Sequence, residues 1–428
     1  MMLVLKNAVL EHNSLLCPQI KDNYVTQQSL EMEFKVSVPG KVILHGEHSV
    51  VYGKAAVAAA IGLRTEAEVQ SSKDVTLNLK DFGQKFTWRL DEFKKLDVNF
   101  GDGEVAIPSE DILKCLRSTF NIGSDTKWHG SLVTFLFLYN GIAQKQSKSP
   151  KNFLPVELII HSTLPIGAGL GSSAAYSVAV AASLLRLFKV VPSKGGVPAK
   201  EDLEIISKWA FQSEVILHGK PSGIDNSICT FGGALLFQKG RIQEINSNVP
   251  LYRVLLVNTQ VPRNTRALVA HVKERVERQP TIMASTFEAM DEIAWQTWRT
   301  LKANSVSGQG TAAAPADLAT KDKAEVKTNQ KLYEFAAELI SMNHHLLNAI
   351  GVGHPILDRI VTVAGTVGFS AKLTGAGGGG CGFILLGVGE PEKVKTNDVR
   401  ADNLRELLIK EGLQFWSVDM GCAGVTFS

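Results

Sequence analysis

Residues 164–177, LPIGAGLGSSAAYS, hold three glycines within five positions, then two serines and the start of an alanine-rich apolar run. Glycine has no Cβ to keep a ligand away from the backbone, and it reaches positive φ without penalty. Residues 156–160 alternate like a strand, and the Ser-Ser pair before helically spaced apolar residues predicts a helix N-terminus. A strand, a glycine loop and a helix start favour an anion site, and phosphate is the anion we expect. A plain glycine turn is the alternative that this stretch alone leaves open.

Three known phosphate loops can be compared with this stretch. The dinucleotide fingerprint G-x-G-x-x-G needs a third glycine at the position of Ser172, and the Walker loop needs a lysine, which follows none of these glycines. The loop of the GHMP small-molecule kinases has the pattern P-x-x-x-G-L-x-S-S-A. The chain resembles that pattern at Pro165, Gly169, Leu170, Ser172, Ser173 and Ala174.

Length and composition limit the class of protein. A chain of 428 residues is long for one core, so we expect two domains. A net charge of +3 gives no reason to expect nucleic acid or an anionic membrane as partner. The five cysteines are far apart, as expected of a protein in the reducing cytoplasm, and the longest apolar run is too short to span a bilayer. Residues 1–33 are interpreted as an N-terminal extension without a signal peptide.

Residues 39–53, PGKVILHGEHSVVYG, resemble the first GHMP motif. Lys41 follows a Pro-Gly turn and opens a predicted strand, and Gly46, Glu47 and His48 come just after that strand. The spacing H-G-E-H excludes the metalloprotease pattern H-E-x-x-H. Taken alone, Lys41 would be a surface lysine, so its significance depends on the other motifs.

Residues 214–226 carry a pair of carboxylates. Glu214 lies near the end of a predicted helix, and the turn 221–223 presents Asp225. Such a pair can share a metal ion and a reacting hydroxyl, whereas the alternative is two solvated side chains. Apolar neighbours at 216, 217, 224 and 228 argue against solvation of the segment. The stretch E-x-x-x-H-G-x-P-S-G-x-D-N resembles the mevalonate kinase branch of the GHMP family.

Residues 372–381, KLTGAGGGGC, resemble the third GHMP motif, although four consecutive glycines could also form a simple hinge. Three motifs in the family order make coincidence a poor explanation. Residues 303–328 are small and polar, and we interpret them as a mobile insertion loop without chemistry.

The resemblance implies an α+β fold of two domains. Residues 34–250 would form a ribosomal-S5-like, ATP-binding N-terminal domain, and residues 251–428 a ferredoxin-like C-terminal domain. The active site would lie in the cleft between them. The implied reaction transfers the γ-phosphate of ATP, with Mg²⁺, to the 5-hydroxyl of (R)-mevalonate, an early step of isoprenoid and sterol precursor synthesis.

The resemblance also implies roles for individual residues. Asp225 would accept the hydroxyl proton with Lys41 beside it, and Ser173 and Glu214 would hold Mg²⁺. Mevalonate would contact Glu47, His48, Asp225 and Thr265. The nucleotide would be bound by Lys41, Asp81, Ser162, Gly167, Ala168, Gly169, Leu170, Gly171, Ser172 and Ser173.

Two alternatives stay open at the level of sequence. One is another GHMP enzyme, such as a phosphomevalonate kinase, a galactokinase-like enzyme or the diphosphomevalonate decarboxylase. The other is a non-catalytic ligand sensor, although a sensor would not need Lys41, Ser173, Glu214 and Asp225 together. For partners, the resemblance implies a cytoplasmic homodimer that is subject to feedback inhibition by prenyl diphosphates, with no nucleic acid or membrane.

Overall fold

The computed structural model describes residues 33–146, 153–165, 167–192, 195–262, 264–305, 318–388 and 399–428. The predicted N-terminal extension therefore lies outside the described residues, except for residue 33, and so does the 306–317 part of the predicted insertion. No helix in the described ranges is both long enough and apolar enough to cross a membrane.

The strands join in one hydrogen-bonded sheet with the order β4-β3-β5-β2-β11-β8-β10-β9, and β1, β6, β7 and β12 pair beside this path. The pairing of β3 with β5 is parallel, whereas β2 pairs antiparallel with β1, β5, β6 and β11. The strands are β1 (Phe34–His45), β2 (Ala56–Ser71), β3 (Val75–Leu79), β4 (Gln84–Trp88), β5 (Val156–Ser162), β6 (Ala234–Gln238), β7 (Arg241–Asn246), β8 (Tyr252–Asn258), β9 (Ala371–Leu373), β10 (Cys381–Val388), β11 (Gln414–Met420) and β12 (Thr426–Phe427).

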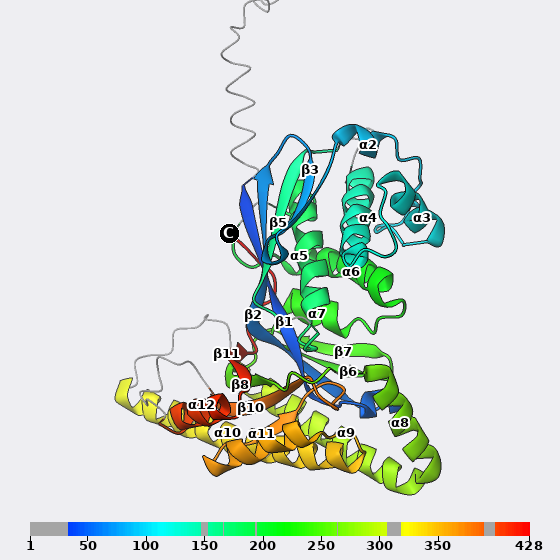
Figure 1. Cartoon of the computed structure of the whole chain (residues 1–428). Coiled ribbons are helices and arrows are strands. Elements are labelled where there is room, and N and C mark those ends of the chain that lie inside the picture. The colour runs from blue at the N-terminus through cyan, green and yellow to red at the C-terminus, as the bar shows by residue number, and fades with distance from the viewer. Residues whose placement is uncertain are drawn as a thin grey trace, which may run out of the picture.

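Helices α2–α4 lie toward one end of the long strands β1 and β2 and α8–α12 toward the other, with α5–α7 between the two groups (Figure 1). They are α2 (Leu90–Lys94), α3 (Glu110–Thr119), α4 (His129–Gln146), α5 (Ser172–Leu187), α6 (Lys200–His218), α7 (Ile224–Phe231), α8 (Thr265–Arg278), α9 (Pro280–Ala303), α10 (Leu318–Ala349), α11 (Pro355–Thr366) and α12 (Val399–Lys410). Two short 3₁₀ helices, η1 (Ser49–Tyr52) and η2 (Lys80–Phe82), follow β1 and β3.

Helix α5 is the central helix of the N-terminal half. Its alanine-rich sequence is apolar on nearly every side, and residues 177–185 are all buried. The helix packs against α6 and α7 and against strands β1 and β2. Its N-terminus is therefore held in place by a large core, which makes it a rigid base for a ligand site.

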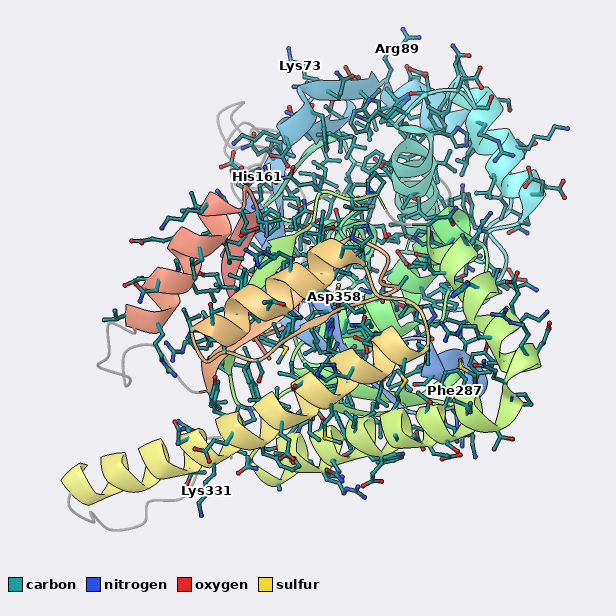
Figure 2. The ribbon with its side chains drawn as sticks, turned by 60° about the horizontal axis from the view of Figure 1, so that its bottom comes forward. Lys73, Arg89, His161, Phe287, Lys331 and Asp358 are labelled. Carbon is teal, nitrogen blue, oxygen red and sulfur yellow. The ribbon has the colours of Figure 1, made fainter. Side chains whose placement is uncertain are left out.

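The C-terminal half has two smaller cores. Leu255, Ile360 and Leu404 belong to one, and Val272, Phe287 and Leu347 belong to the other. Helices α9 and α10 lie side by side, with Phe287 on α9 and Lys331 on α10 (Figure 2). The last strand, β12, returns to the N-terminal half and pairs with Val36 and Ser37 of β1.

The predicted elements around the glycine loop are confirmed by β5, α5, α6 and the start of α7. The prediction of a loop through residue 328 is wrong over its last part, because α10 begins at Leu318. The reason is that small and polar residues lower helix propensity only modestly, and a lack of aromatics does not prevent a helix that continues into a packed segment. We propose the domain boundary at residues 250–251, just before β8.

Candidate active site

A cavity of about 680 Å³ opens beside the glycine loop. Its walls come from strands β1, β2, β3 and β5, from the starts of α5 and α7 and from the end of α6. The lining residues that the sequence predicted are Lys41, Asp81, Ser162, Gly167, Gly169, Gly171, Ser172, Ser173 and Asp225. Most of the predicted site is thus assembled around one cavity.

The glycine loop, residues 167–173, is fastened to strand β1. The amide of Lys41 donates a hydrogen bond of 2.9 Å to the carbonyl of Leu170. Gly171 has φ 81°, and a Cβ added there would lie 2.7 Å from Cγ of Lys41. Only glycine permits this approach, because another residue would be strained by its φ and would also clash with Lys41. The loop therefore fixes the stem of the lysine that enters the cavity.

The N-terminus of α5 points its amides at the same space. Gly171 is the residue that precedes the helix and has no side chain to cap it, so the first-turn amides keep their donor capacity for a ligand. Gly167, Gly169, Ser172 and Ser173 line the cavity. Ala168 and Leu170 are buried, and their side chains anchor the loop to the core.

Lys41 and Asp225 form an ion pair inside the cavity. Nζ of Lys41 lies 3.0 Å from Oδ2 of Asp225, with side-chain exposures of 10% and 37%. Gly223 precedes α7 with φ 82°, and this turn places Asp225 in the first turn of the helix. The pair joins a cation and a carboxylate that come from positions far apart in the sequence.

Glu214 lies on α6 behind the ion pair and is almost completely buried. Burial, together with the charge of Asp225, raises the pKa of the Glu214 carboxyl to about 7. Within the described residues its Oε1 has no partner at hydrogen-bond geometry, and the nearby Ser177 hydroxyl only partly offsets the rise in pKa. A buried carboxylate oxygen without a hydrogen bond destabilises the folded protein unless a ligand or an ion binds to it.

The sequence reasoning missed His218, the last residue of α6. Its Nε2 lies 3.2 Å from Oγ of Ser173 and 3.7 Å from Oε2 of Glu214. The imidazole thus connects the two predicted metal ligands. The signal was present in the motif E-x-x-x-H, because residues four apart share one face of a helix.

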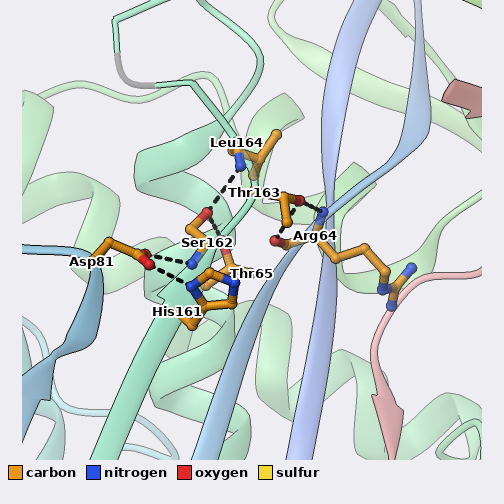
Figure 3. Close-up of polar contacts among 7 residues, drawn as sticks. All are labelled: Arg64, Thr65, Asp81, His161, Ser162, Thr163 and Leu164. Carbon is orange, nitrogen blue, oxygen red and sulfur yellow. Dashed lines mark hydrogen bonds and ion pairs between the residues drawn. The ribbon is translucent and has the colours of Figure 1, made fainter. Parts of the chain in front are cut away.

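Asp81 and Ser162 meet at the far end of the cavity (Figure 3). The backbone N–H of Ser162 donates a hydrogen bond of 2.7 Å to Oδ2 of Asp81, and His161 contacts the other carboxylate oxygen. The Ser162 hydroxyl lies 2.8 Å from that of Thr65. Asp81 therefore connects η2 to the end of β5, shortly before the glycine loop in the sequence.

An aromatic wall lines the cavity beyond Asp81, and no sequence motif predicted it. The rings of Phe82 and Trp128 are 4.6 Å apart between centroids, and Nζ of Lys127 lies 5.0 Å from the Trp128 ring. A flat apolar surface with a cation beside it suits a planar ring that carries phosphates.

Six predicted residues do not line this cavity: Ala168, Leu170 and Glu214, described above, and the three that follow. Glu47 is buried, and its carboxylate contacts Lys372 and Asn343. His48 is also buried, and its Nε2 lies 2.8 Å from the carbonyl of Ala376. Thr265 is the exposed first residue of α8. Their predicted contact with substrate stays a prediction.

Family profiles match both halves of the chain. The profile of the GHMP kinases N terminal domain matches residues 138–233, and that of the GHMP kinases C terminal matches residues 329–412. A mevalonate kinase from Mus musculus is 40% identical over 402 residues, which cover 91% of this chain and 94% of the relative. This chain belongs to the mevalonate kinase family. A second relative, the mevalonate kinase of Arabidopsis thaliana, is 37% identical over 84% of this chain and 92% of its own length.

Solved structures of a mevalonate kinase and of a galactokinase share the fold. The Methanococcus jannaschii mevalonate kinase superposes with a TM-score of 0.64 at 23% identity, covering 91% of this chain and 98% of that chain. A galactokinase from Lactococcus lactis, solved with galactose, gives a TM-score of 0.54 at 18% identity, with coverage of 95% and 99%. The predicted GHMP kinase fold is confirmed, but a fold shared with a galactokinase cannot by itself identify the substrate.

Proposed function

We propose that this protein transfers the γ-phosphate of ATP to the 5-hydroxyl of (R)-mevalonate. The observation that carries the proposal is the Lys41–Asp225 pair, which faces the same cavity as the glycine loop. Near full-length similarity to mevalonate kinases selects the alcohol. Phosphoryl transfer needs positioned reactants and neutralised charge more than covalent participation by the protein, and this cavity offers both.

The amides of residues 167–173 and the positive end of the α5 dipole hold the phosphates of ATP. Asp81 and Ser162 lie beyond the loop, and the wall of Phe82 and Trp128 continues the same cavity. The nucleoside end of ATP lies against this wall, which places the γ-phosphate toward Lys41 and Asp225.

Asp225 accepts the proton of the attacking hydroxyl, because it is the carboxylate that both lines the cavity and contacts the lysine. Lys41 neutralises the charge that develops on the alcohol and on the transferred phosphoryl group. Both groups are held by packed elements, one by β1 and one by α7, so their separation is set before substrate binds.

The residues present fit a magnesium ion. Mg²⁺ in kinases is held by one or two protein oxygens together with substrate phosphates, and the described residues contain no cluster of three or more His, Cys, Asp or Glu side chains that would form a self-sufficient metal site. Glu214 supplies a buried oxygen that makes no hydrogen bond by geometry within the described residues, and Ser173 supplies a hydroxyl that is linked to Glu214 through the imidazole of His218. The ion would neutralise phosphate charge, and these two side chains would hold it.

On the substrate side, we assign mevalonate to the region of His48, Thr265 and Asp225. Three further assignments follow the family: a homodimer, a cytoplasmic location and inhibition by prenyl diphosphates that compete with ATP. A glycine loop that holds a diphosphate supports the last of these. Farnesyl diphosphate should raise the apparent KM for ATP without lowering kcat, and a non-competitive pattern would contradict this assignment.

A coupled ATPase assay with Mg²⁺ tests the proposal against its alternatives. Mevalonate, phosphomevalonate, galactose and homoserine are compared at equal concentrations. Mevalonate should be turned over far faster than the other three. Faster turnover of another alcohol would assign the chain to that reaction, and binding without turnover of any would favour a ligand sensor.

A further inference from the structure

A buried ion pair outside the cavity links the two halves of the chain. Lys372 on β9 contacts Oε1 of Glu47, and each side chain is only 1% exposed. Nδ2 of Asn343 on α10 donates 3.1 Å to Oε2 of the same carboxylate. Both oxygens of Glu47 therefore have partners within the protein.

Such a pair is a poor source of stability. Removing two charges from water is costly, and apolar residues of similar volume often stabilise a protein equally well. Burial lowers the pKa of the Lys372 ammonium, and the neighbouring Glu47 opposes this shift. What the pair provides is a fixed orientation, because each group can satisfy its hydrogen bonds only in this arrangement.

The element that it orients is the GEH turn, residues 46–48. Gly46 has φ 96°, and a Cβ there would lie 2.3 Å from the carbonyl oxygen of Ala55. His48 also has a positive φ, 59°, which is strained for a side chain of its size. A turn with two such residues needs support from its surroundings, and Glu47 between them is the residue that Lys372 and Asn343 hold.

Beyond the turn lies the second glycine loop, residues 375–380. His48 contacts the carbonyl of Ala376 in this loop at 2.8 Å. A Cβ at Gly377 would lie 2.1 Å from the carbonyl oxygen of Val352, and one at Gly379 would lie 2.6 Å from that of Val261. The second glycine loop thus packs against Val352 and Val261 of the C-terminal half, and it also contacts His48.

We propose that Lys372 and Asn343 are positioning residues for the alcohol substrate. They fix Glu47, and through it they set the distance between His48 and the second glycine loop on the substrate side of the site. In this view Glu47 acts through the turn and does not itself contact the substrate. The inference rests on the proposed function, because it assigns the GEH turn to the alcohol and not to ATP.

The test measures KM for mevalonate and for ATP separately in Lys372→Met, which removes the buried cation, and in Asn343→Leu, which removes only the hydrogen bond. The KM for mevalonate should rise about tenfold or more in Lys372→Met and less in Asn343→Leu, because small displacements of positioning groups have large effects. The KM for ATP should change by no more than about twofold in both, in contrast to the expected tenfold change for mevalonate.

Leu408→Ala is the matched control. Leu408 is fully buried on α12 in the core that contains Leu404, so this variant is also destabilised, but it does not touch the turn. A comparable rise in the KM for mevalonate in Leu408→Ala would mean that the effect follows lost stability, and this would overturn the proposal.

The double variant Glu47→Gln/Lys372→Met separates positioning from contact. If Lys372 acts through Glu47, the double variant is no worse than the worse single variant. Multiplied effects would show that Glu47 contacts mevalonate directly. If Lys372→Met does not fold, Asn343→Leu decides, and an unchanged KM for mevalonate there overturns the proposal. A wild-type protein that does not phosphorylate mevalonate would instead refute the proposed function.

Discussion

Nζ of Lys41 lies 3.0 Å from Oδ2 of Asp225, although 184 positions separate the two residues (225 − 41). The glycine loop packs against the aliphatic part of the lysine side chain. The amide of Lys41 is bonded to Leu170, and its side chain passes under Gly171. The loop that we assign to phosphate binding and the ion pair that we assign to catalysis are therefore in direct contact. A substitution in the glycine loop should therefore alter the position of the ion pair, and a substitution in the pair should alter the loop.

Asp225→Asn keeps the shape of the side chain but removes its ability to accept a proton. We expect kcat to fall on the order of 10²–10⁴-fold, which is the usual contribution of general acid–base catalysis. The affinity for ATP, measured by equilibrium binding, should change little, because Asp225 is assigned no phosphate contact. An Asp225→Asn enzyme with normal kcat would refute its role as base.

Lys41→Met should also lower kcat, since the carboxylate and the developing charge lose their cation. The double variant Asp225→Asn/Lys41→Met should be much less impaired than the product of the two single losses, because paired residues act as one unit. Steady-state kcat of the four proteins completes the cycle. Fully multiplicative losses would mean that the two residues contribute independently despite their contact.

Ser173→Ala and Glu214→Gln should weaken the apparent affinity for Mg²⁺ together with kcat. Each removes one of the two oxygens that we assign to the ion, and the conservative shapes leave the fold intact. Titration of activity with MgCl₂ at saturating ATP measures the effect. His218→Asn serves as the comparison: it removes the imidazole that links Ser173 to Glu214 but removes neither oxygen, so its Mg²⁺ dependence should shift less. Equal Mg²⁺ dependence in Ser173→Ala, Glu214→Gln and the wild type would contradict the metal assignment.

Asp81→Ala should raise the KM for ATP by about tenfold or more, because a charged hydrogen bond contributes about 1.5–3 kcal/mol and each 1.4 kcal/mol is about tenfold, and it should leave the KM for mevalonate unchanged. The carboxylate holds the amide of Ser162 at the mouth of the glycine loop. His161→Ala is the matched control, because it removes the other contact of Asp81 but leaves the Ser162 bond. A larger rise in His161→Ala than in Asp81→Ala would show that the imidazole is the important partner.

The contribution of His45 should destabilise the folded protein in mild acid. Burial and the charge of Lys372 hold the pKa of His45 well below its ordinary value of 6.5, so below that pH the unfolded chain binds a proton that the folded chain does not. The free energy of unfolding then decreases as pH falls, by at most about 1.4 kcal/mol per pH unit for one group.

Urea unfolding of the wild type and of His45→Gln between about pH 7.5 and about pH 5.5 measures this contribution. The wild type should lose more stability than the variant over this range. Glu214 titrates in the opposite sense, because its pKa is raised to about 7, but it is present in both proteins and cancels in the difference. Identical pH slopes would contradict the assignment to His45.

The sequence was most informative where chemistry depends on local pattern. The glycine loop, the start of α5 and the turn before Asp225 are short motifs whose geometry follows from glycine and from helix capping. The alternation of residues 156–160 likewise predicted β5 closely. These features could be predicted because each is decided by residues that are neighbours in the chain.

The features that were missed depend on residues brought together by folding. Lys372 and Glu47 are 325 positions apart, and the sequence motif around neither residue indicates a buried ion pair. Lys127 and Trp128 reach Phe82 only because η2 lies beside the start of α4. Local propensity also failed at residues 318–328, where a polar segment continues into the packed part of α10.

The most direct test of the central claim is a product assay of wild type and Asp225→Asn with Mg-ATP and (R)-mevalonate, followed by ³¹P NMR. We predict that the wild type forms one new phosphomonoester, on the 5-oxygen of mevalonate, with one ADP released per product. Asp225→Asn should bind both substrates but form this product at a rate lower by on the order of 10²–10⁴-fold. ADP release by the wild type without a phosphorylated mevalonate, or equal rates in the two proteins, would contradict the account.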